Sequence, residues 1–262
     1  MKKECSNTYF DEMNMRAKAL LNNPGNFLKR RAIIDVIFSN KFRKINQNKN
    51  RILDVGAGIG DVAFEVLQRI VSDIYISIDI DNNTIKGAKI TLQSCQKCEF
   101  VQADAQKLPF RSEIFDMVIC SEVLEHLPYD LIALREIKQV SKKDGIIIIT
   151  VPYLEKFLKP GHLRRYDLYS FMKLCSNAQL KIEDIRFCCI SIQYIRNILR
   201  KIYKREGMGK CETLLYSQIS PIISFFILIF QLIDDMLVQL LKNLKFLNES
   251  TLVACLHKKI NE

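Results

Sequence analysis

The hydrophobic and polar positions of the chain form two kinds of segment that alternate. Short apolar runs, such as 52–55 and 146–151, predict strands buried on both faces of a parallel sheet. Longer stretches carry apolar residues at helical spacing, as at Val62, Val66 and Ile70. Repeated alternation of strand and helix is typical of an α/β fold with a doubly wound sheet.

The turn after the first predicted strand has the most specific local pattern. It places Gly56, Gly58 and Gly60 after Asp54, and glycine there lets a ligand approach the backbone closely. A dinucleotide fingerprint requires its third glycine where Asp61 stands, and this acid would face a pyrophosphate unfavourably. The spacing therefore indicates a nucleotide-binding turn other than the dinucleotide type.

Two further predicted strands end in acids. The run 74–79 ends at Asp79, about 20 residues after the turn, where a carboxylate can accept hydrogen bonds from both hydroxyls of a ribose. Asp81 is an alternative for this role, and Asp81 or Asn82 can cap the helix that follows. The run 99–104 ends at Asp104.

A fourth segment, 115–128, combines a predicted strand with the sequence Ser121-Glu-Val-Leu-Glu-His126. Together with the glycine turn and the two acids, in this order within residues 45–155, it resembles the class I S-adenosylmethionine-dependent methyltransferases. The fourth segment is similar to the type 11 group of small-molecule methyltransferases.

This resemblance implies S-adenosyl-L-methionine as the cofactor. Asp104 would contact the adenine amino group, and the backbone N–H of Ala105 would contact a ring nitrogen. The expected cofactor-binding residues are Asp54, Gly56, Gly58, Gly60, Asp79, Asp104, Ala105 and Ser121.

The resemblance also implies a Rossmann-like, doubly wound sheet of seven strands with an antiparallel last strand, in a single domain over 1–262. The last two strands are expected at 180–192 and 251–259, where the family normally has a short hairpin. Here about 55 residues intervene, which is too long for an ordinary loop. We therefore predict a helical insertion at 193–249, and an N-terminal helical cap at 1–45.

The insertion contains a basic run at 196–210 and an apolar stretch at 221–247. The apolar stretch is short for a membrane span and is interrupted by Asp234 and Asp235. Two interpretations stay open: the helix packs on its own domain or on a partner in a homodimer, or 196–247 makes peripheral contact with an anionic membrane.

Five residues that follow the predicted fourth and fifth strands are candidates for the acceptor side. His126 and His162 are candidate catalytic bases. Tyr153, Arg165 and Tyr166 could orient an acceptor, and Arg165 would favour an acidic one.

Composition adds less. The 262-residue chain has a net charge of +10 and nine cysteines. Cys95 and Cys98 form a lone Cys-x-x-Cys without a second pair or nearby histidines, so we expect no metal site. Irregular cysteine spacing and an N-terminus without an apolar segment predict a cytoplasmic protein, with membrane association as an alternative.

We therefore predict a methyltransferase that O- or C-methylates a small-molecule or lipid-like acceptor. The Asn-Pro-Pro-Tyr motif of amino-nitrogen methyltransferases is absent, and 121–124 occupies its place. One alternative is a nucleic-acid methyltransferase, although no recognised nucleic-acid-binding module gives a strong signal. The other is a non-catalytic adenosylmethionine-binding partner subunit, because an intact cofactor loop does not establish turnover.

Overall fold

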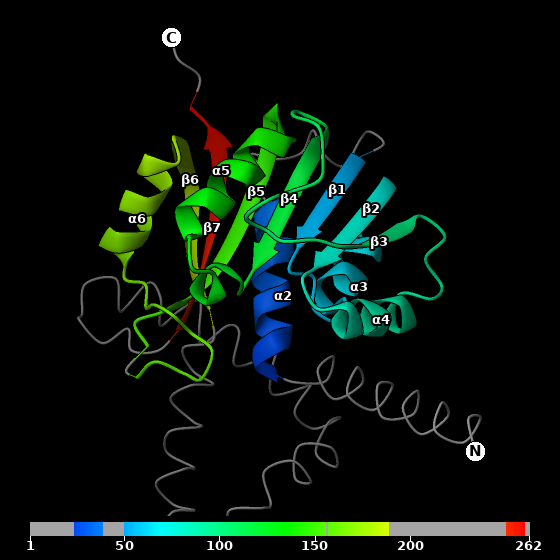
Figure 1. Cartoon of the computed structure of the whole chain (residues 1–262), viewed down its shortest axis with the longest axis horizontal. Helices are drawn as coiled ribbons and strands as arrows, with labels where there is room; N and C mark the ends of the chain where they lie inside the picture. The colour runs from blue at the N-terminus through cyan, green and yellow to red at the C-terminus, as the bar shows by residue number, and fades with distance from the viewer. Residues whose placement is uncertain (1–23, 39–49, 156, 189–249, 260–262) are drawn as a thin grey trace, which may run out of the picture.

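A seven-stranded sheet lies between two layers of helices in the computed structural model, which describes residues 24–38, 50–155, 157–188 and 250–259 (Figure 1). The strands are β1 (Asn50–Val55), β2 (Ser72–Asp79), β3 (Cys98–Gln102), β4 (Phe115–Ser121), β5 (Ser141–Tyr153), β6 (Leu180–Cys188) and β7 (Ser250–Lys258). The helices are α2 (Pro24–Ile37), α3 (Asp61–Leu67), α4 (Asn82–Thr91), α5 (Asp130–Val140) and α6 (Leu168–Asn177), with a short 3-10 turn, η2 (Leu124–His126).

The strand order is β3-β2-β1-β4-β5-β7-β6. The pairs among β1 to β5 are parallel, and β7 runs antiparallel to both β5 and β6. The predicted doubly wound, Rossmann-like sheet of seven strands with an antiparallel last strand is therefore confirmed.

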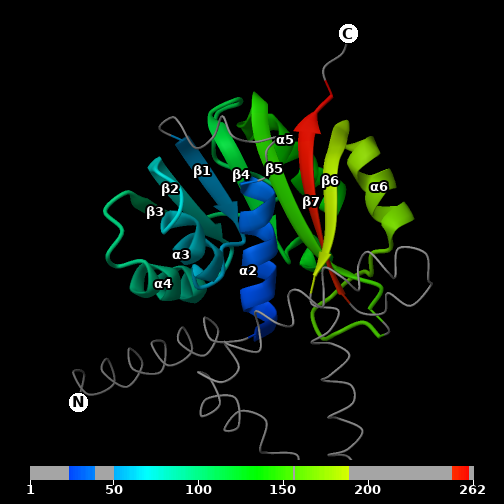
Figure 2. The ribbon, with the colours of Figure 1, turned by 180° about the vertical axis from the view of Figure 1, so that it is seen from behind.

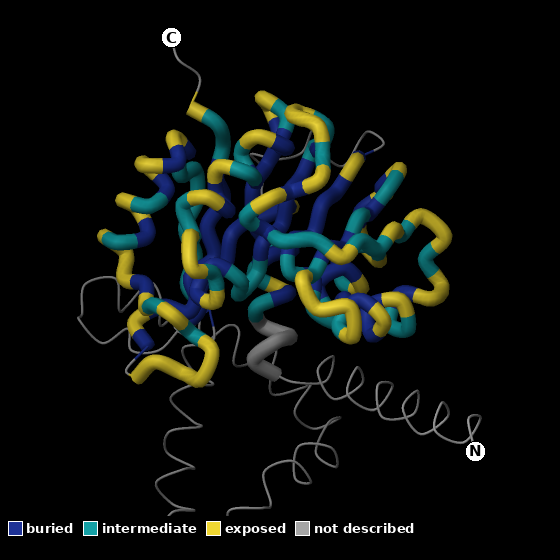
Figure 3. Tube along the Cα trace, viewed as in Figure 1, coloured by how far each residue is buried: buried dark blue, intermediate teal, exposed yellow. Residues whose placement is uncertain are grey.

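Both faces of the sheet are buried, and alternate residues of one strand serve different cores. In β4, Val118 and Cys120 belong to the core beneath α5 and α6, whereas Met117 and Ile119 belong to the core beneath α2 and α3. Figures 1 and 2 show these helix pairs on opposite faces, and the central strands appear as the buried part of the trace in Figure 3. This double burial explains why the strands read as continuous apolar runs.

Helix starts follow local chemistry. Asp81 caps α4, because its carboxylate accepts the Asn83 N–H at 3.0 Å. Of the two predicted caps, Asp81 is thus the one observed, and the helix starts at Asn82 as expected. At α6, Asp167 and Ser170 exchange hydrogen bonds in a capping box.

Helix α2 begins at Pro24, inside the predicted N-terminal cap, since proline fits the first turn of a helix, where its missing N–H costs nothing. One strand boundary differs from the sequence-based expectations. The fifth strand was expected only over 146–151 but extends over Ser141–Tyr153. The register between β4 and β5 shifts where Phe115 pairs with Ser141 and Met117 with Ile146, so the part of β5 before Ile146 is irregular.

Several predictions concern residues outside the described ranges and stay predictions. These are most of the N-terminal cap (1–45), the last part of the expected strand 180–192, the insertion 193–249 and the membrane or dimer contact through 196–247. Among the described residues, no helix combines the length and apolar character that crossing a membrane requires.

The cysteines of the described part are all buried or paired. Cys120 and Cys188 are buried, as expected for small hydrophobic side chains. Cys95 and Cys98, for which no zinc site was expected, form a disulfide after α4.

A buried acid links strands β1 and β2. Asp54 on β1 is only 1% exposed, and its Oδ2 accepts a hydrogen bond from the hydroxyl of Tyr75 on β2 at 2.9 Å. Burial raises the pKa of Asp54 to about 7, because the charged carboxylate loses its hydration and the Tyr75 bond only partly compensates. The Asp54 proton is therefore held more tightly in the folded than in the unfolded chain.

This arrangement predicts a specific pH dependence of stability. Between the ordinary Asp pKa of 3.8 and the folded value of about 7, the folded state binds more protons, so the Asp54 contribution to stability falls as pH rises. Asp54→Asn should remove this decline and, relative to wild type, be more stable at pH 8 than at pH 5 by about 2–4 kcal/mol. Urea unfolding at both pH values measures the difference. The exposed Asp73→Asn on β2 is the matched control, and parallel profiles for wild type and Asp54→Asn would contradict the assignment.

Candidate active site

The carboxyl ends of five parallel strands meet at one edge of the sheet. Val55, the last residue of β1, pairs with Ile78 on one side and with Cys120 on the other. Asp79 and Ser121, each one residue further along, therefore flank the glycine turn. The strand order reverses between β1 and β4, and this switch point is where open α/β sheets bind ligands.

The glycines of the turn have different roles. Gly56 has a φ of 66°, and a Cβ added there would lie 2.3 Å from Cγ2 of Val123, so this glycine permits contact with the segment after β4. Gly58 has a φ of 56°, yet a Cβ added there would meet nothing within 4 Å. The turn thus packs against the domain at Gly56 and borders open space at Gly58.

Asp79 connects this turn to the next helix. Its Oδ2 accepts the Gly58 N–H at 3.1 Å, and its Oδ1 accepts the Asp81 N–H at 3.0 Å. The side chain is half-buried at the edge of the sheet. Asp81 is engaged as the cap of α4, so Asp79 is the acid that faces the switch point.

Asp104 forms a tight turn after β3. Its Oδ1 accepts the Gln106 N–H at 2.8 Å, and its carbonyl accepts the Lys107 N–H at 2.9 Å. Ala105 is buried between them. The Gln106 side chain accepts the Tyr129 N–H at 3.0 Å, which joins the β3 turn to the loop after η2.

The end of β4 is held against β5. The hydroxyls of Ser121 and Thr150 lie 2.9 Å apart, and the Glu122 N–H donates to the Thr150 carbonyl at 3.0 Å. Glu122 has a φ of 56°, a left-handed conformation that is uncommon for a residue with a side chain. Its carboxylate pairs with Lys29 of α2 at 3.5 Å.

The two predicted histidines lie together. Their ring centroids are 4.8 Å apart and the rings are nearly perpendicular. Nδ1 of His126 lies 2.8 Å from the Gly161 carbonyl oxygen, and Nδ1 of His162 lies 2.7 Å from Oε2 of Glu155. Each ring therefore has one nitrogen in a fixed hydrogen bond.

Glu125 lies beside them and was missed by sequence reasoning. It is 1% exposed, and neither carboxylate oxygen has a hydrogen-bond partner among the described residues. Loss of hydration, with repulsion from Glu122, raises the pKa of Glu125 to about 8. The available signal was its position directly before His126, although an acid in a turn is normally expected in water.

The other three residues that were predicted for the acceptor side have different environments. Tyr166 is buried, donates its hydroxyl to Asp130 at 2.9 Å and pairs through its backbone with Tyr153, so it supports the loop. Tyr153 is buried at the end of β5, and Arg165 is exposed with Nη1 3.4 Å from the Glu155 carbonyl.

Arg164, which was not predicted, joins the two loops on the acceptor side. Its guanidinium donates to the carbonyls of Leu127 at 2.6 Å and Pro128 at 2.8 Å and pairs with Asp130. Sequence spacing could not distinguish Arg164 from its neighbour Arg165, because both lie in an irregular loop without a fixed period.

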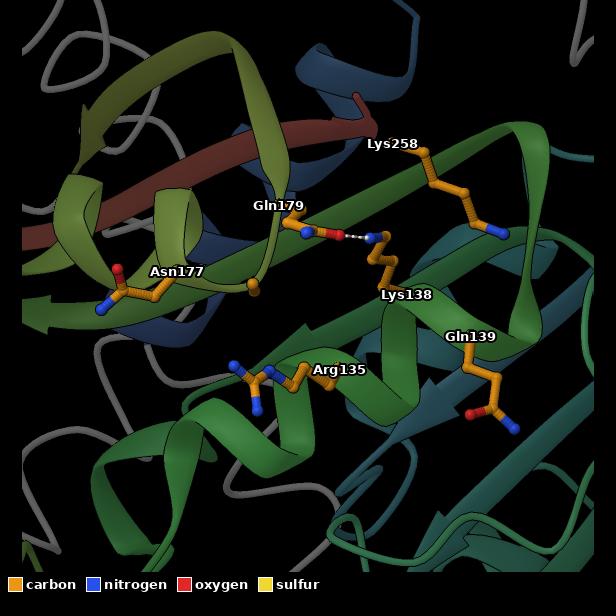
Figure 4. Close-up of a pocket in the computed structure, with 7 residues that line it drawn as sticks. Arg135, Lys138, Gln139, Asn177, Gln179 and Lys258 are labelled. Atoms are coloured by element: carbon orange, nitrogen blue, oxygen red, sulfur yellow. Dashed lines mark hydrogen bonds between the residues drawn. The ribbon is translucent and has the colours of Figure 1, made fainter. Parts of the chain in front are cut away.

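A separate cavity of about 380 Å³ lies at the opposite edge of the sheet, between α5 and α6 (Figure 4). It is lined by Arg135, Lys138, Gln139, Asn177, Ala178, Gln179 and Lys258. Two of its cations are engaged, Lys138 with Gln179 at 2.7 Å and Lys258 with Glu113 at 3.2 Å. The cavity is far from the carboxyl ends of the strands and is not the candidate active site.

Comparisons with known proteins agree with this geometry. The model of a methyltransferase family, described as a methyltransferase domain of type 11, matches residues 53–149. The protein MJ0638 of Methanocaldococcus jannaschii is 30% identical over 183 residues, which are 62% of this chain and 76% of that protein. The ubiquinone/menaquinone biosynthesis C-methyltransferase UbiE of Pseudomonas putida is 34% identical over 159 residues, or 58% of each chain.

Among solved structures, phosphoethanolamine N-methyltransferase 2 of Haemonchus contortus, in complex with S-adenosyl-L-methionine, superposes with a TM-score of 0.57. It shares 15% identity and covers 88% of this chain and 52% of its own, so it supports the fold alone. The chain spans less than two thirds of the length of most curated relatives that it matches. Strand order, glycine turn, edge acids and these matches agree, and the chain belongs to the class I S-adenosylmethionine-dependent methyltransferases, in the type 11 group.

Proposed function

We propose that this protein transfers the methyl group of S-adenosyl-L-methionine to a small-molecule or lipid-like acceptor, on oxygen or carbon. The observation that carries the proposal is the contact between Asp79 and the Gly58 N–H at the switch point of the sheet. It holds a ribose-binding acid beside a turn that leaves room for a ligand.

The residues at this edge fit the cofactor. Each carboxylate oxygen of Asp79 accepts one backbone N–H and keeps a further lone pair, which suits the two hydroxyls of a ribose. Gly58 leaves space where a side chain would block the ligand. Asp104 and Ala105, on the β3 turn, would receive the adenine, and Ser121 closes the other side.

The protein mainly positions the reactants. When bound, the cofactor supplies a methyl group on a positively charged sulfonium. The acceptor atom forms a bond to the methyl carbon while the carbon–sulfur bond breaks and its electron pair stays on sulfur. Residues after β4 and β5 would hold the acceptor in line and exclude water, which lowers the entropic part of the barrier.

In this mechanism the two histidines would remove the proton from the acceptor. His126 and His162 are at the carboxyl edge, on the loops that follow β4 and β5. Tyr153 and Arg165 would orient the acceptor, whereas the hydroxyl of Tyr166 is already used by Asp130. UbiE relatives are C-methyltransferases of ubiquinone and menaquinone biosynthesis, which supports a lipid-like acceptor.

Cofactor binding gives the first test. The protein should bind S-adenosyl-L-methionine and not NAD, and Asp79→Ala should weaken binding by about 1.5–3 kcal/mol, because a hydrogen bond to a charged group is lost. Isothermal titration calorimetry measures both. Asp73→Ala, an exposed acid near the other end of β2, should bind as wild type does. NAD binding without adenosylmethionine binding would contradict the proposal.

The histidines give a second test. His126→Ala and His162→Ala should leave cofactor affinity unchanged, while at least one lowers methyl transfer by about 10²-fold because proton removal is lost. His257→Ala on β7 is the control, since it removes the third histidine of the chain away from the site. Full turnover in both site variants would leave positioning alone as the mechanism.

The acceptor class can be read from products. Incubation with methyl-labelled cofactor and cell extract, followed by separation into lipid, small-molecule and nucleic-acid fractions, should place the label in the lipid or small-molecule fraction. Asp79→Ala serves as the background. Label in nucleic acid alone would instead support a nucleic-acid methyltransferase.

A further inference from the structure

Three potential metal ligands converge on the acceptor side. One ligand atom from each of Glu125, His126 and His162 lies within 4.8 Å of the others. Glu125 and His126 belong to η2 after β4, whereas His162 comes from the loop after β5. The loops are joined by a hydrogen bond from the Leu163 N–H to the Glu125 carbonyl at 2.7 Å, so the cluster is part of the fold.

The hydrogen bond of His126 selects one tautomer. Its Nδ1 lies 2.8 Å from the Gly161 carbonyl oxygen, and a carbonyl can only accept. Nδ1 therefore donates its proton, and Nε2 keeps a free lone pair. This Nε2 lies 3.9 Å from Oε1 of Glu125. Metal-binding histidines commonly donate their other nitrogen to a backbone carbonyl in this way.

His162 has the same arrangement with a carboxylate. Its Nδ1 lies 2.7 Å from Oε2 of Glu155, and the other oxygen of Glu155 pairs with Lys159 at 2.6 Å. A Glu155 carboxylate that is paired with a lysine accepts the Nδ1 proton, which leaves Nε2 of His162 as the basic nitrogen. A carboxylate behind an imidazole is the usual outer partner of a metal-ligating histidine.

Glu125 supplies the independent observation. Its carboxylate is almost fully buried, faces the histidine pair and has no hydrogen-bond donor among the described residues. A buried carboxylate without a partner is costly unless a cation or a proton neutralises it. Lys29 and Thr150 make their hydrogen bonds to the neighbouring acid, Glu122, and neither donates one to Glu125.

We propose that Glu125, His126 and His162 bind a divalent metal ion on the acceptor side of the active site. Two imidazoles and one carboxylate suit a first-row transition ion such as Mn²⁺, Co²⁺ or Zn²⁺ and leave positions for further ligands. This departs from the sequence-based expectation of no metal site, which considered the cysteine pair.

The spacing is compatible with this ligand set. Bonds from such ions to nitrogen and oxygen are about 2.0–2.2 Å, so two ligands on opposite sides of one ion lie about 4.0–4.4 Å apart. The three ligand atoms lie within 4.8 Å of one another, slightly more than this span, so side-chain rotations would have to bring them to one ion.

The role of the ion in methyl transfer rests on the proposed function. An open position on the ion would bind a hydroxyl of the acceptor and lower its pKa, so that its proton leaves to solvent and the oxyanion attacks the methyl carbon. This assigns the acceptor class as a molecule with an ionisable hydroxyl at, or conjugated to, the methylated atom. The histidines would then act as metal ligands in place of direct bases.

Mn²⁺ is the probe of choice, because it favours oxygen and nitrogen ligands over the thiols of this cysteine-containing chain. The full chain, freed of metal with a chelator, should bind one Mn²⁺. Calorimetry measures this binding, and so does the decrease of the electron paramagnetic resonance signal of free Mn²⁺. His126→Ala and His162→Ala should each weaken binding at least about tenfold, the size of effect known even for outer partners of ligands, and the double variant should abolish it. His257→Ala should bind like wild type.

Glu125→Gln keeps the side-chain shape and removes the charge. With Mn²⁺, only wild type should gain melting temperature. No Mn²⁺ binding by wild type, or binding retained in the histidine double variant or in Glu125→Gln, would overturn the proposal.

The cofactor titration separates the two proposals. If the wild-type protein does not bind adenosylmethionine, the proposed methyltransferase function is wrong. The Mn²⁺ titration would still test the metal site. Conversely, methyl transfer that is unchanged in a chelator, with cofactor binding intact, would remove the role of the metal in the reaction.

Discussion

The parallel pairing of β1 with β2 on one side and β4 on the other is the constraint on which the active-site edge depends. The register pairs Val55 with Ile78 and with Cys120. The residues that follow these three strands therefore lie side by side at one edge of the sheet. The Asp79 carboxylate can then reach the Gly58 N–H across the turn. A slip of one residue would turn these side chains to the other face of the sheet and would break both cores.

The acceptor side is built differently, from contacts between two loops. Arg164 donates to two carbonyls of the loop after β4, and His126 donates to the Gly161 carbonyl in the opposite direction. These bonds tie η2 to the segment after β5. The cofactor edge thus rests on strand register and the acceptor side on loop hydrogen bonds, so substitutions on one side need not disturb the other.

Most of the fold and the cofactor edge could be predicted from local patterns. Strands buried on both faces appear as apolar runs, and the glycine turn has a fixed spacing to the acids that follow. The acceptor side was predictable only in part. His126 and His162 were found singly, whereas Glu125 was missed and Arg165 was chosen where Arg164 makes the joining bonds. No period relates residues in loops, so sequence spacing does not indicate which side chains meet.

The sequence by itself determined the order of strands and helices along the chain, the glycine turn and the acids at the strand ends. These features follow from short-range periodicity and backbone conformation. Only the tertiary structure decided that Asp79 rather than Asp81 faces the turn, since Asp81 is used as a helix cap. It also decided that Glu125 is buried without a partner beside two oriented imidazoles. Burial and tautomer depend on what distant segments place around a side chain, and that environment exists only once the chain has folded.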